Sequence, residues 1–259
     1  MDVERWYYAV LQYDGSRFCG WQRQPADRTV QAEFEAALGR IAGQTVAVTA
    51  AGRTDTGVHA LGQVVSFSLT REWDALELER ALNAQTPQDL WVVEAGRAPD
   101  GFHARKQAES RRYRYVIGCD PAARSPFRRP FEWALCRPLD LPRLHAAAQL
   151  IQGEHQFRSL SSHSQVKEHY LCTIRDAEWT ERKRSRGFIF HIDANRFLHR
   201  MVRFLVGIMV DVALQKRPLE DIGRLLESED NQGASPPAPP EGLYFVRAHY
   251  SHLKFRTQL

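Results

Sequence analysis

The spacing of hydrophobic and polar positions along the first hundred residues predicts strands and helices in a fixed order. Apolar residues that alternate or run together over a few positions indicate strands, and a recurrence every three or four positions indicates a helix. Strands are expected at 6–12, 46–51, 63–69 and 90–93, and helices at 29–41, where Thr29 can cap the first turn, and at 73–82. The resulting order, strand-helix-strand-strand-helix-strand, is that of a ferredoxin-like α+β unit.

The second part of the chain predicts a similar mixture. Strands are expected at 110–117, 170–180, 187–193 and 243–250, and helices at 140–152, 195–215 and 219–227. The helix at 195–215 has the widest apolar stripe, and Arg203 lies in its middle between Val202 and Phe204. A buried arginine needs a carboxylate partner, whereas one that extends along the helix surface can reach solvent. The pattern alone leaves both interpretations open.

Candidate chemistry gathers in the loop between the two strands at 46–51 and 63–69. This loop reads Gly52-Arg53-Thr54-Asp55-Thr56-Gly57-Val58-His59-Ala60, and it combines a carboxylate, a guanidinium and an imidazole with two glycines. The simplest interpretation is an ordinary hairpin turn, because Asp and Gly are common turn residues. Aspartic proteases also use an Asp-Thr-Gly tripeptide. They need two catalytic aspartates that share a proton, whereas this chain contains a single Asp-Thr-Gly tripeptide.

The full nine-residue segment resembles the catalytic loop of the TruA family of tRNA pseudouridine synthases. The resemblance implies that Asp55 is the essential aspartate, that Tyr113 is the active-site tyrosine and that Arg203, in Met201-Val202-Arg203, pairs with the aspartate. Phe102-His103-Ala104-Arg105, and less closely Gly153-Glu154-His155-Gln156-Phe157, also resemble family segments; Gln156 replaces the usual acid. The implied substrate-binding residues are Tyr113, Arg53, His59, Arg105, Arg112 and Arg114.

The resemblance covers nearly the whole chain and carries further expectations. It implies an α+β fold of two ferredoxin-like halves, at 1–107 and 108–259, whose antiparallel sheets join across a central cleft. It implies an isomerase that converts uridine to pseudouridine at positions 38, 39 and 40 of the tRNA anticodon stem-loop. It also implies a homodimer. The sequence contains no phosphate-binding loop, dinucleotide fingerprint or metal-ligand pattern, so we expect neither cofactor nor metal.

Composition agrees with an RNA-binding protein of the cytoplasm. The 259 residues carry a formal net charge of +4, which permits nucleic-acid binding without requiring it. We expect no membrane span or secretion signal, because no apolar run is long enough and acidic residues stand near the N-terminus. The four cysteines are far apart and read as free thiols; neither they nor His163 and His169 follow a zinc pattern.

Two other functions remain compatible with this pattern. A non-catalytic RNA-binding protein would tolerate Asp55→Ala, and alternating Tyr and Arg residues at 112–115 would suit it as well. A glycosidase acting on a small molecule would normally need a second carboxylate beside the scissile bond. The basic run at 182–186 fits either a solvated hairpin tip or an RNA contact.

Overall fold

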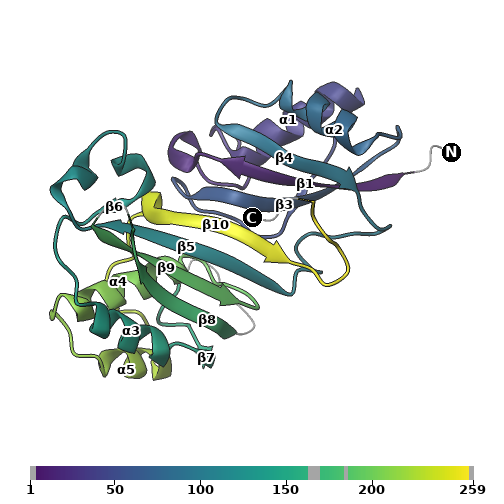
Figure 1. Ribbon diagram of the computed structural model, residues 1–259. Coiled ribbons are helices and arrows are strands. Elements are labelled where there is room, and N and C mark those ends of the chain that lie inside the picture. The colour runs from purple at the N-terminus through teal and green to yellow at the C-terminus, as the bar shows by residue number, and fades with distance from the viewer. Residues whose placement is uncertain (1–3, 163–169, 184–185, 257–259) are drawn as a thin grey trace. The chain divides into compact units, whose positions relative to one another are not determined.

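The computed structural model describes residues 4–162, 170–183 and 186–256, which form two compact units (Figure 1). The first unit consists of Met1–Arg111 together with Tyr244–Leu259, and the second of Arg112–Leu243. This division differs from the expected boundary between residues 107 and 108. The chain leaves the first unit four residues later than expected, and its C-terminal segment returns to that unit.

The first unit is a mostly antiparallel sheet with two helices. Its strands lie in the order β4-β1-β3-β10; the short β2 also pairs with β3, and β10 runs parallel to β3. The elements are β1 (Arg5–Tyr13), η1 (Gly15–Arg17), α1 (Val30–Ala42), β2 (Thr49–Ala50), β3 (His59–Leu69), α2 (Ala75–Asn83), β4 (Leu90–Arg97) and β10 (Leu243–His249).

Helix α1 begins and ends as its sequence dictates. The Thr29 side chain accepts a hydrogen bond from the Ala32 amide at the N-terminus, as expected. Gly43 adopts a left-handed conformation and stops the helix. The buried Phe34 ring meets Phe67 of β3 edge-on at 6.0 Å between centroids, so α1 covers this face of the sheet.

The C-terminal segment covers the opposite face of the same sheet. The Tyr250 hydroxyl donates to the Ala104 carbonyl at 2.6 Å, and the Phe255 ring packs against Tyr8. Tyr8 is buried and donates to Glu94 at 2.5 Å; burial raises the pKa of the Tyr8 hydroxyl. These contacts explain why the last described residues belong to the first unit.

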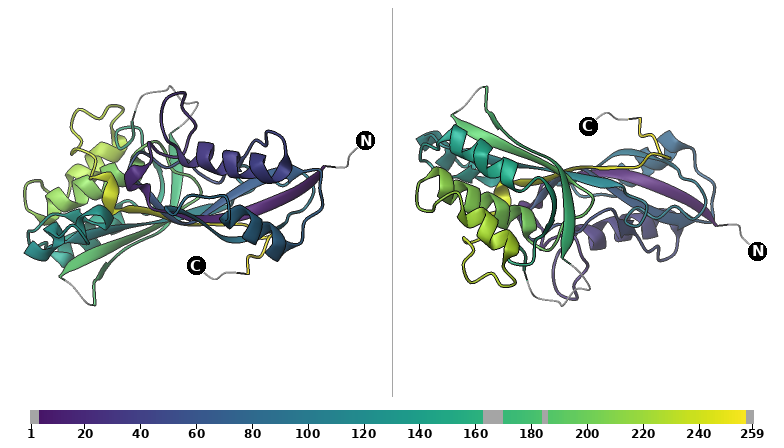
Figure 2. Two further views of the ribbon diagram at one scale, coloured as in Figure 1. Left: turned by 90° about the horizontal axis from the view of Figure 1, so that it is seen from above. Right: turned by 90° about the horizontal axis from the view of Figure 1, so that it is seen from below.

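The second unit is a sheet in the order β5-β9-β8-β7, with β6 parallel to β5. Figure 2 shows its three α-helices together on one side of the sheet. The elements are β5 (Ser110–Gly118), η2 (Pro121–Arg124), η3 (Arg129–Phe131), β6 (Trp133–Ala134), α3 (Leu141–Leu150), β7 (Gly153–Gln156), β8 (Leu171–Glu181), β9 (Gly187–Ala194), α4 (Met201–Ala213), α5 (Asp221–Glu227) and η4 (Pro240–Gly242).

Aromatic packing fixes α4 against this sheet. Trp179 of β8 stacks on Phe190 of β9 at 4.9 Å between centroids, and the Trp179 indole N–H points at the sulfur of Met209 on α4 at 3.2 Å. All three side chains are fully or almost fully buried. Burying a large apolar side chain contributes roughly 1.5–3 kcal/mol, so this cluster is a major part of the second core.

Two predicted elements are shorter than expected. The strand expected at 46–51 is reduced to Thr49–Ala50, because the Val48 amide donates to the buried Glu35 side chain instead of a neighbouring strand. The helix expected at 195–215 begins only at Met201. Arg200 before it adopts a left-handed conformation with φ of 60°, which ends the helical path on that side.

Candidate functional site

A tight turn presents Asp55 at the surface of the first unit. The Val58 amide donates to the Asp55 carbonyl at 3.1 Å, and Gly57 supplies the positive φ of 79° that this turn requires. The Asp55 side chain is partly exposed, while Thr54 and Val58 on either side are buried. Arg53 is exposed, and among the described residues its side chain makes no hydrogen bond or ion pair.

The end of β1 and the segment that follows it hold this turn in place from one side. The hydroxyls of Tyr13 and Thr54 are hydrogen-bonded at 2.8 Å, and the Trp21 amide donates to the Thr54 carbonyl at 3.0 Å. Gly20 lies so close that a Cβ atom there would be 2.8 Å from the Thr54 carbonyl oxygen. The backbone immediately before Asp55 is therefore held by two hydrogen bonds and by close packing.

His59 is buried behind the turn. The Gly15 amide donates to Nδ1 of His59 at 3.0 Å, and the Asp14 carboxylate lies 3.3 Å from the same nitrogen. The imidazole stacks on Tyr244 at 4.8 Å between centroids, and only 2% of His59 is exposed. The ring supports the turn and the adjacent Gly15 segment.

The other end of the loop is held by two further side chains. The Gln63 amide donates to the Gly52 carbonyl at 2.6 Å, and the Arg111 guanidinium donates to the carbonyl of Ala51 at 3.2 Å. Arg111 also donates to the carbonyls of Arg105 and Ala108. Both ends of the loop around Asp55 are thus fixed, which suits a residue that must hold a precise position.

Tyr113 and Arg203 both belong to the second unit. Tyr113 on β5 is 7% exposed, and its ring meets Phe197 edge-on at 4.9 Å between centroids. Arg203 is half-buried in the first turn of α4, where its Nε donates to the Ala238 carbonyl at 2.7 Å. The Ala238 amide donates back to the Arg203 carbonyl at 2.9 Å.

The loop that contains Ala238 is fitted closely to α4 and β5. A Cβ atom on Gly207 would lie 2.3 Å from the Pro236 carbonyl oxygen, and the buried Tyr115 hydroxyl donates to the Pro239 carbonyl at 2.7 Å. Burial raises the pKa of Tyr115 well above its ordinary value, and the charge of Arg203 opposes this shift. Arg203 and Tyr115 therefore donate to the carbonyls of adjacent residues, Ala238 and Pro239, and Tyr115 shares a strand face with Tyr113.

The three remaining predicted RNA-binding arginines have different surroundings. Arg112 and Arg114 lie on the face of β5 opposite Tyr113, as strand alternation requires. Arg112 is next to two carboxylates, 3.3 Å from Asp176 and 3.6 Å from Asp193. Arg105 is exposed in a turn before β5. The structure brings neither Arg112 nor Arg114 to the Tyr113 side of the strand.

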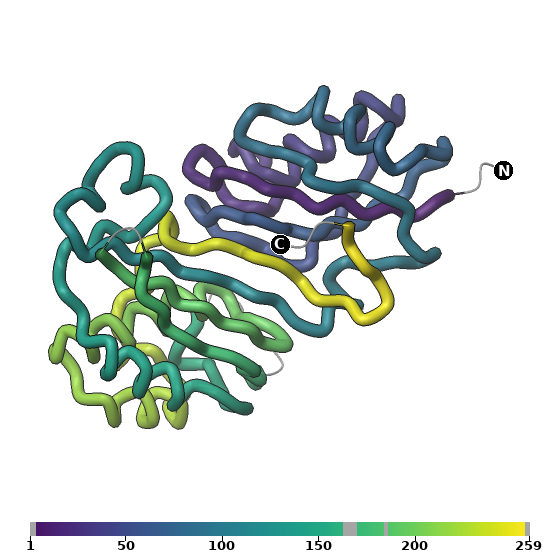
Figure 3. The backbone as a smooth tube through the Cα atoms, in the orientation of Figure 1, coloured from purple at the N-terminus to yellow at the C-terminus, as the bar shows by residue number. Residues whose placement is uncertain are grey.

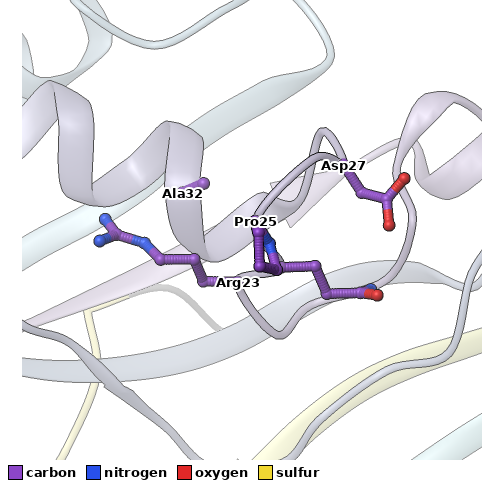
Figure 4. Close-up of a pocket in the computed structure, with 5 residues that line it drawn as sticks. Arg23, Pro25, Asp27 and Ala32 are labelled. Carbon is purple, nitrogen blue, oxygen red and sulfur yellow. The ribbon is translucent and has the colours of Figure 1, made fainter.

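A hollow of about 500 Å³ lies beside the N-terminal end of α1, lined by Arg23, Gln24, Pro25, Asp27 and Ala32 (Figure 4). The Arg23 side chain extends from this hollow to form an ion pair with the buried Glu35. The hollow contains none of the predicted catalytic residues, so it is a separate feature of the first unit.

The described part of the chain offers no metal site: no three His, Cys, Asp or Glu side chains within it are grouped closely enough to bind an ion. His163 and His169 lie outside the described residues, as do Arg184 and Ser185 of the basic run at 182–186. Within the same ranges, no helix has the length and hydropathy needed to cross a membrane.

Comparison with known proteins identifies the class to which this fold and site belong. A sequence profile for tRNA pseudouridine synthases matches residues 9–105 and 147–251. The chain therefore belongs to the tRNA pseudouridine synthase family, whose members are isomerases that act on tRNA.

Individual relatives are similar to this chain over most of its length. The protein called tRNA pseudouridine synthase A from Chlorobium limicola is 40% identical to this chain, and the match covers 93% of this chain and 97% of that protein. The protein of the same name from Hydrogenovibrio crunogenus is 38% identical, and the match covers 93% of this chain and 90% of that protein. The protein of that name from Streptococcus pneumoniae is 36% identical over 94% of this chain and 98% of its own. A crystal structure of a Cbf5-Nop10-Gar1 complex has a TM-score of 0.39 at 12% identity, covering 92% of this chain and 48% of that one; this similarity is too low to support an argument.

Several supporting residues were not predicted from the sequence. Tyr13, Thr54 and Gly20 hold the backbone before Asp55, and Ala238 holds Arg203. The bond between Tyr13 and Thr54 links positions 41 residues apart, and local periodicity carries no information about such a contact. The glycine between Cys19 and Trp21 was the one available signal, since glycine often marks a close backbone approach.

Proposed function

We propose that this chain converts uridine to pseudouridine at positions 38, 39 and 40 of the tRNA anticodon stem-loop, with Asp55 as the catalytic residue. The observation that carries the proposal is the partly exposed Asp55 carboxylate on a turn whose flanking residues are fixed. Membership of the tRNA pseudouridine synthase family supplies the reaction. In this proposal the first unit brings Asp55 to Tyr113 and Arg203 of the second, across a cleft between two ferredoxin-like halves.

The reaction is an isomerisation, so atoms and electrons balance without a co-reactant. The bond between N1 of uracil and C1′ of ribose breaks, a bond between C5 and C1′ forms, the C5 proton leaves and N1 gains a proton. The target base must first leave its stack at a cost of a few kcal/mol. Arg53 is exposed and unpaired among the described residues, which suits it to occupy the vacated space.

The proposed roles follow from the chemistry of each side chain. The Asp55 carboxylate attacks C1′ or C6 as a nucleophile, and Arg203 pairs with it and orients it. The Tyr113 ring stacks on the detached uracil while it rotates, and its hydroxyl assists removal of the C5 proton. Phe197 fixes the plane of the Tyr113 ring by its edge-on contact.

We propose separate roles for the remaining predicted site residues. We assign His59 a positioning role, because its ring is buried and accepts the Gly15 amide. Arg105 contacts the RNA backbone from its exposed turn, and Arg112 and Arg114 reach RNA only from the face of β5 away from Tyr113. We also propose that the protein acts as a homodimer in the cytoplasm, where its free thiols remain reduced.

Release of tritium from tRNA labelled at C5 of uridine tests the proposed reaction. The wild-type protein should release label from a tRNA with uridine at positions 38–40. It should release none when those uridines are replaced by cytidine. Asp100→Asn, a change at an exposed aspartate outside the site, serves as the matched control and should behave as wild type. Equal release from both tRNAs would refute the proposed position.

A further inference from the structure

The second unit carries an exposed aromatic residue among arginines. The residues 121–131, which we call the 121–131 knob, follow β5 and contain the helical turns η2 and η3; Figure 3 traces them as a loop projecting from this unit. Phe127 is 89% exposed, more than any other large hydrophobic residue described, and Phe131 is 41% exposed. Neither the fold of the second unit nor the proposed reaction uses the Phe127 ring.

Ion pairs and hydrogen bonds fix the base of the knob. Arg128 donates to both oxygens of Asp120, at 2.8 and 3.4 Å, and forms an ion pair with the buried Glu132 at 2.7 Å. Arg182, the residue that follows β8, also forms an ion pair with Glu132. Asp120 in addition accepts the Ala123 amide, and hydrogen bonds from Arg128 lower the pKa of Asp120. The exposed residues therefore stand on a rigid support.

Crowding beneath the knob confirms that its position is built into the fold. A Cβ atom on Gly118 would be 2.5 Å from the Ala123 side chain and 2.6 Å from a Glu132 oxygen. Only glycine at the end of β5 lets the knob approach so closely. Pro126 and Pro130 flank the exposed phenylalanine and restrict its backbone, so less conformational entropy is lost when the segment binds a partner.

Two arginines of the knob, like the exposed Arg53, have no ion-pair partner among the described residues. Arg71, Arg97 and Arg143 each lie within 3.5 Å of a carboxylate. Arg124 and Arg129 are exposed too, but in the described ranges their side chains have neither an ion pair nor a hydrogen bond. The acids beside them, Asp120 and Glu132, are already paired with Arg128 and Arg182. Two cations next to Phe127 thus remain uncompensated.

We propose that the 121–131 knob binds an unpaired nucleotide of the tRNA other than the target uridine. Its base stacks on the Phe127 ring, and Arg124 and Arg129 contact the flanking phosphates. Unpaired bases stack on exposed aromatic rings, and guanidinium groups bind phosphate, so this pair of features matches a single-stranded segment of RNA. The inference rests on the proposed function, because it takes tRNA as the ligand and adds a second contact to it.

Charge distribution favours RNA over a protein partner. Residues 121–131 include three arginines and no Asp or Glu, so a partner must supply the negative charge, as tRNA phosphates do. Exposed arginines stand on both sides of Phe127 in sequence, at 124 and 129. A second copy of this chain would have to bury those cations, whereas an RNA strand would pair with them.

Binding of unmodified tRNA to Phe127 variants tests the proposal separately from turnover. Phe127→Ala and Phe127→Leu should both raise the Kd for tRNA by about ten-fold, the scale of losing one stacked base, while Phe127→Trp should retain wild-type affinity. Arg124→Gln should lower the slope of log Kd against log salt by about 0.7–0.9. Trp91→Ala, at an aromatic residue 52% exposed on β4, is the matched control and should change the Kd less than about two-fold.

The possible outcomes separate the alternatives. An unchanged Kd in Phe127→Ala, or a Phe127→Leu variant that binds as wild type, would overturn the stacking contact. A Phe127→Ala variant with unchanged Kd but an altered oligomeric state, measured by light scattering, would assign the knob to a contact between proteins. The proposed reaction fails in a different way, when wild-type protein releases no tritium, and the Kd measurements are independent of that result.

Discussion

The hydroxyls of Tyr13 and Thr54 form a buried hydrogen bond of 2.8 Å that ties the end of β1 to the residue before Asp55. Tyr13 is 4% exposed and Thr54 is 6% exposed, so water cannot replace the bond if it is lost. This hydrogen bond and a second one, from the Trp21 amide to the Thr54 carbonyl, fix the position of the Asp55 turn. The first strand thereby sets the location of the proposed catalytic carboxylate.

Tyr13→Phe should lower both stability and activity. The change removes one buried hydrogen bond and leaves the Thr54 hydroxyl without this partner, at an expected cost of about 1–3 kcal/mol. Activity should fall more than tRNA affinity, because Asp55 is displaced while the RNA-binding surface is unchanged. Urea unfolding gives the first quantity, and tritium release with a binding titration gives the others. Wild-type activity in a destabilised variant would show that the bond is structural only.

Gly20→Ala should also disturb the turn, through crowding. Its Cβ atom would approach the Thr54 carbonyl oxygen to 2.8 Å, in a backbone with φ of +83°. Gly43→Ala is the matched control, since Gly43 also has positive φ, at +69°, but nothing within 4 Å of the added atom. Left-handed strain costs about 1 kcal/mol or more in both variants. Only Gly20→Ala should lose activity by ten-fold or more. Equal activity in the two variants would contradict the proposal that close packing of Gly20 against Thr54 positions Asp55.

The sequence predicted most helices and strands of the fold, where a local signal existed. Thr29 and the apolar stripe after it placed α1 within a residue of its observed start. Local patterns did not predict β6, whose two residues pair with β5, or the start of β3 at His59. His59 and Ala60 pair with Tyr244 and Phe245 of β10, and such a distant partner leaves no periodic trace nearby.

The candidate site was predicted from motifs rather than from periodicity. Asp55, Tyr113 and Arg203 came from family resemblance, and strand alternation correctly separated Tyr113 from Arg112. The environment of Arg203 was less accessible to prediction. Its Nε donates to a carbonyl in the loop that follows α5, and the sequence around Ala238 gives no sign of this contact. Long-range contacts of this kind require the folded chain.

Arg203→Lys should reduce turnover sharply and leave the fold intact. Lysine has no Nε–H in the position that donates to Ala238, and its single ammonium group cannot form the paired, planar contact of a guanidinium with a carboxylate. We expect kcat to fall by about 100-fold or more and the unfolding free energy by about 1 kcal/mol. Arg203→Met should have at least as large an effect on kcat. Wild-type rates in Arg203→Met would exclude the proposed pairing with Asp55.

Stability at alkaline pH should report on Tyr13. Burial raises the pKa of Tyr13 to about 12 from 10.0. Between these values the unfolded chain has lost the tyrosine proton and the folded protein retains it, so the unfolding free energy falls as pH rises. Tyr13→Phe removes this contribution, and its stability should decline less steeply over the same interval. Urea midpoints for both proteins at about pH 9 and pH 11 measure the difference; parallel declines would contradict the shift.

Pseudouridine mapping in unmodified tRNA, with wild type and Asp55→Asn compared side by side, tests the central claim most directly. We predict pseudouridine at positions 38–40 with wild type, and a loss of at least about 100-fold in rate for Asp55→Asn, as expected for a missing nucleophile. The Kd for tRNA should change less than about three-fold. Residual turnover above about one per cent, at unchanged positions, would contradict the assignment of Asp55 as the catalytic residue.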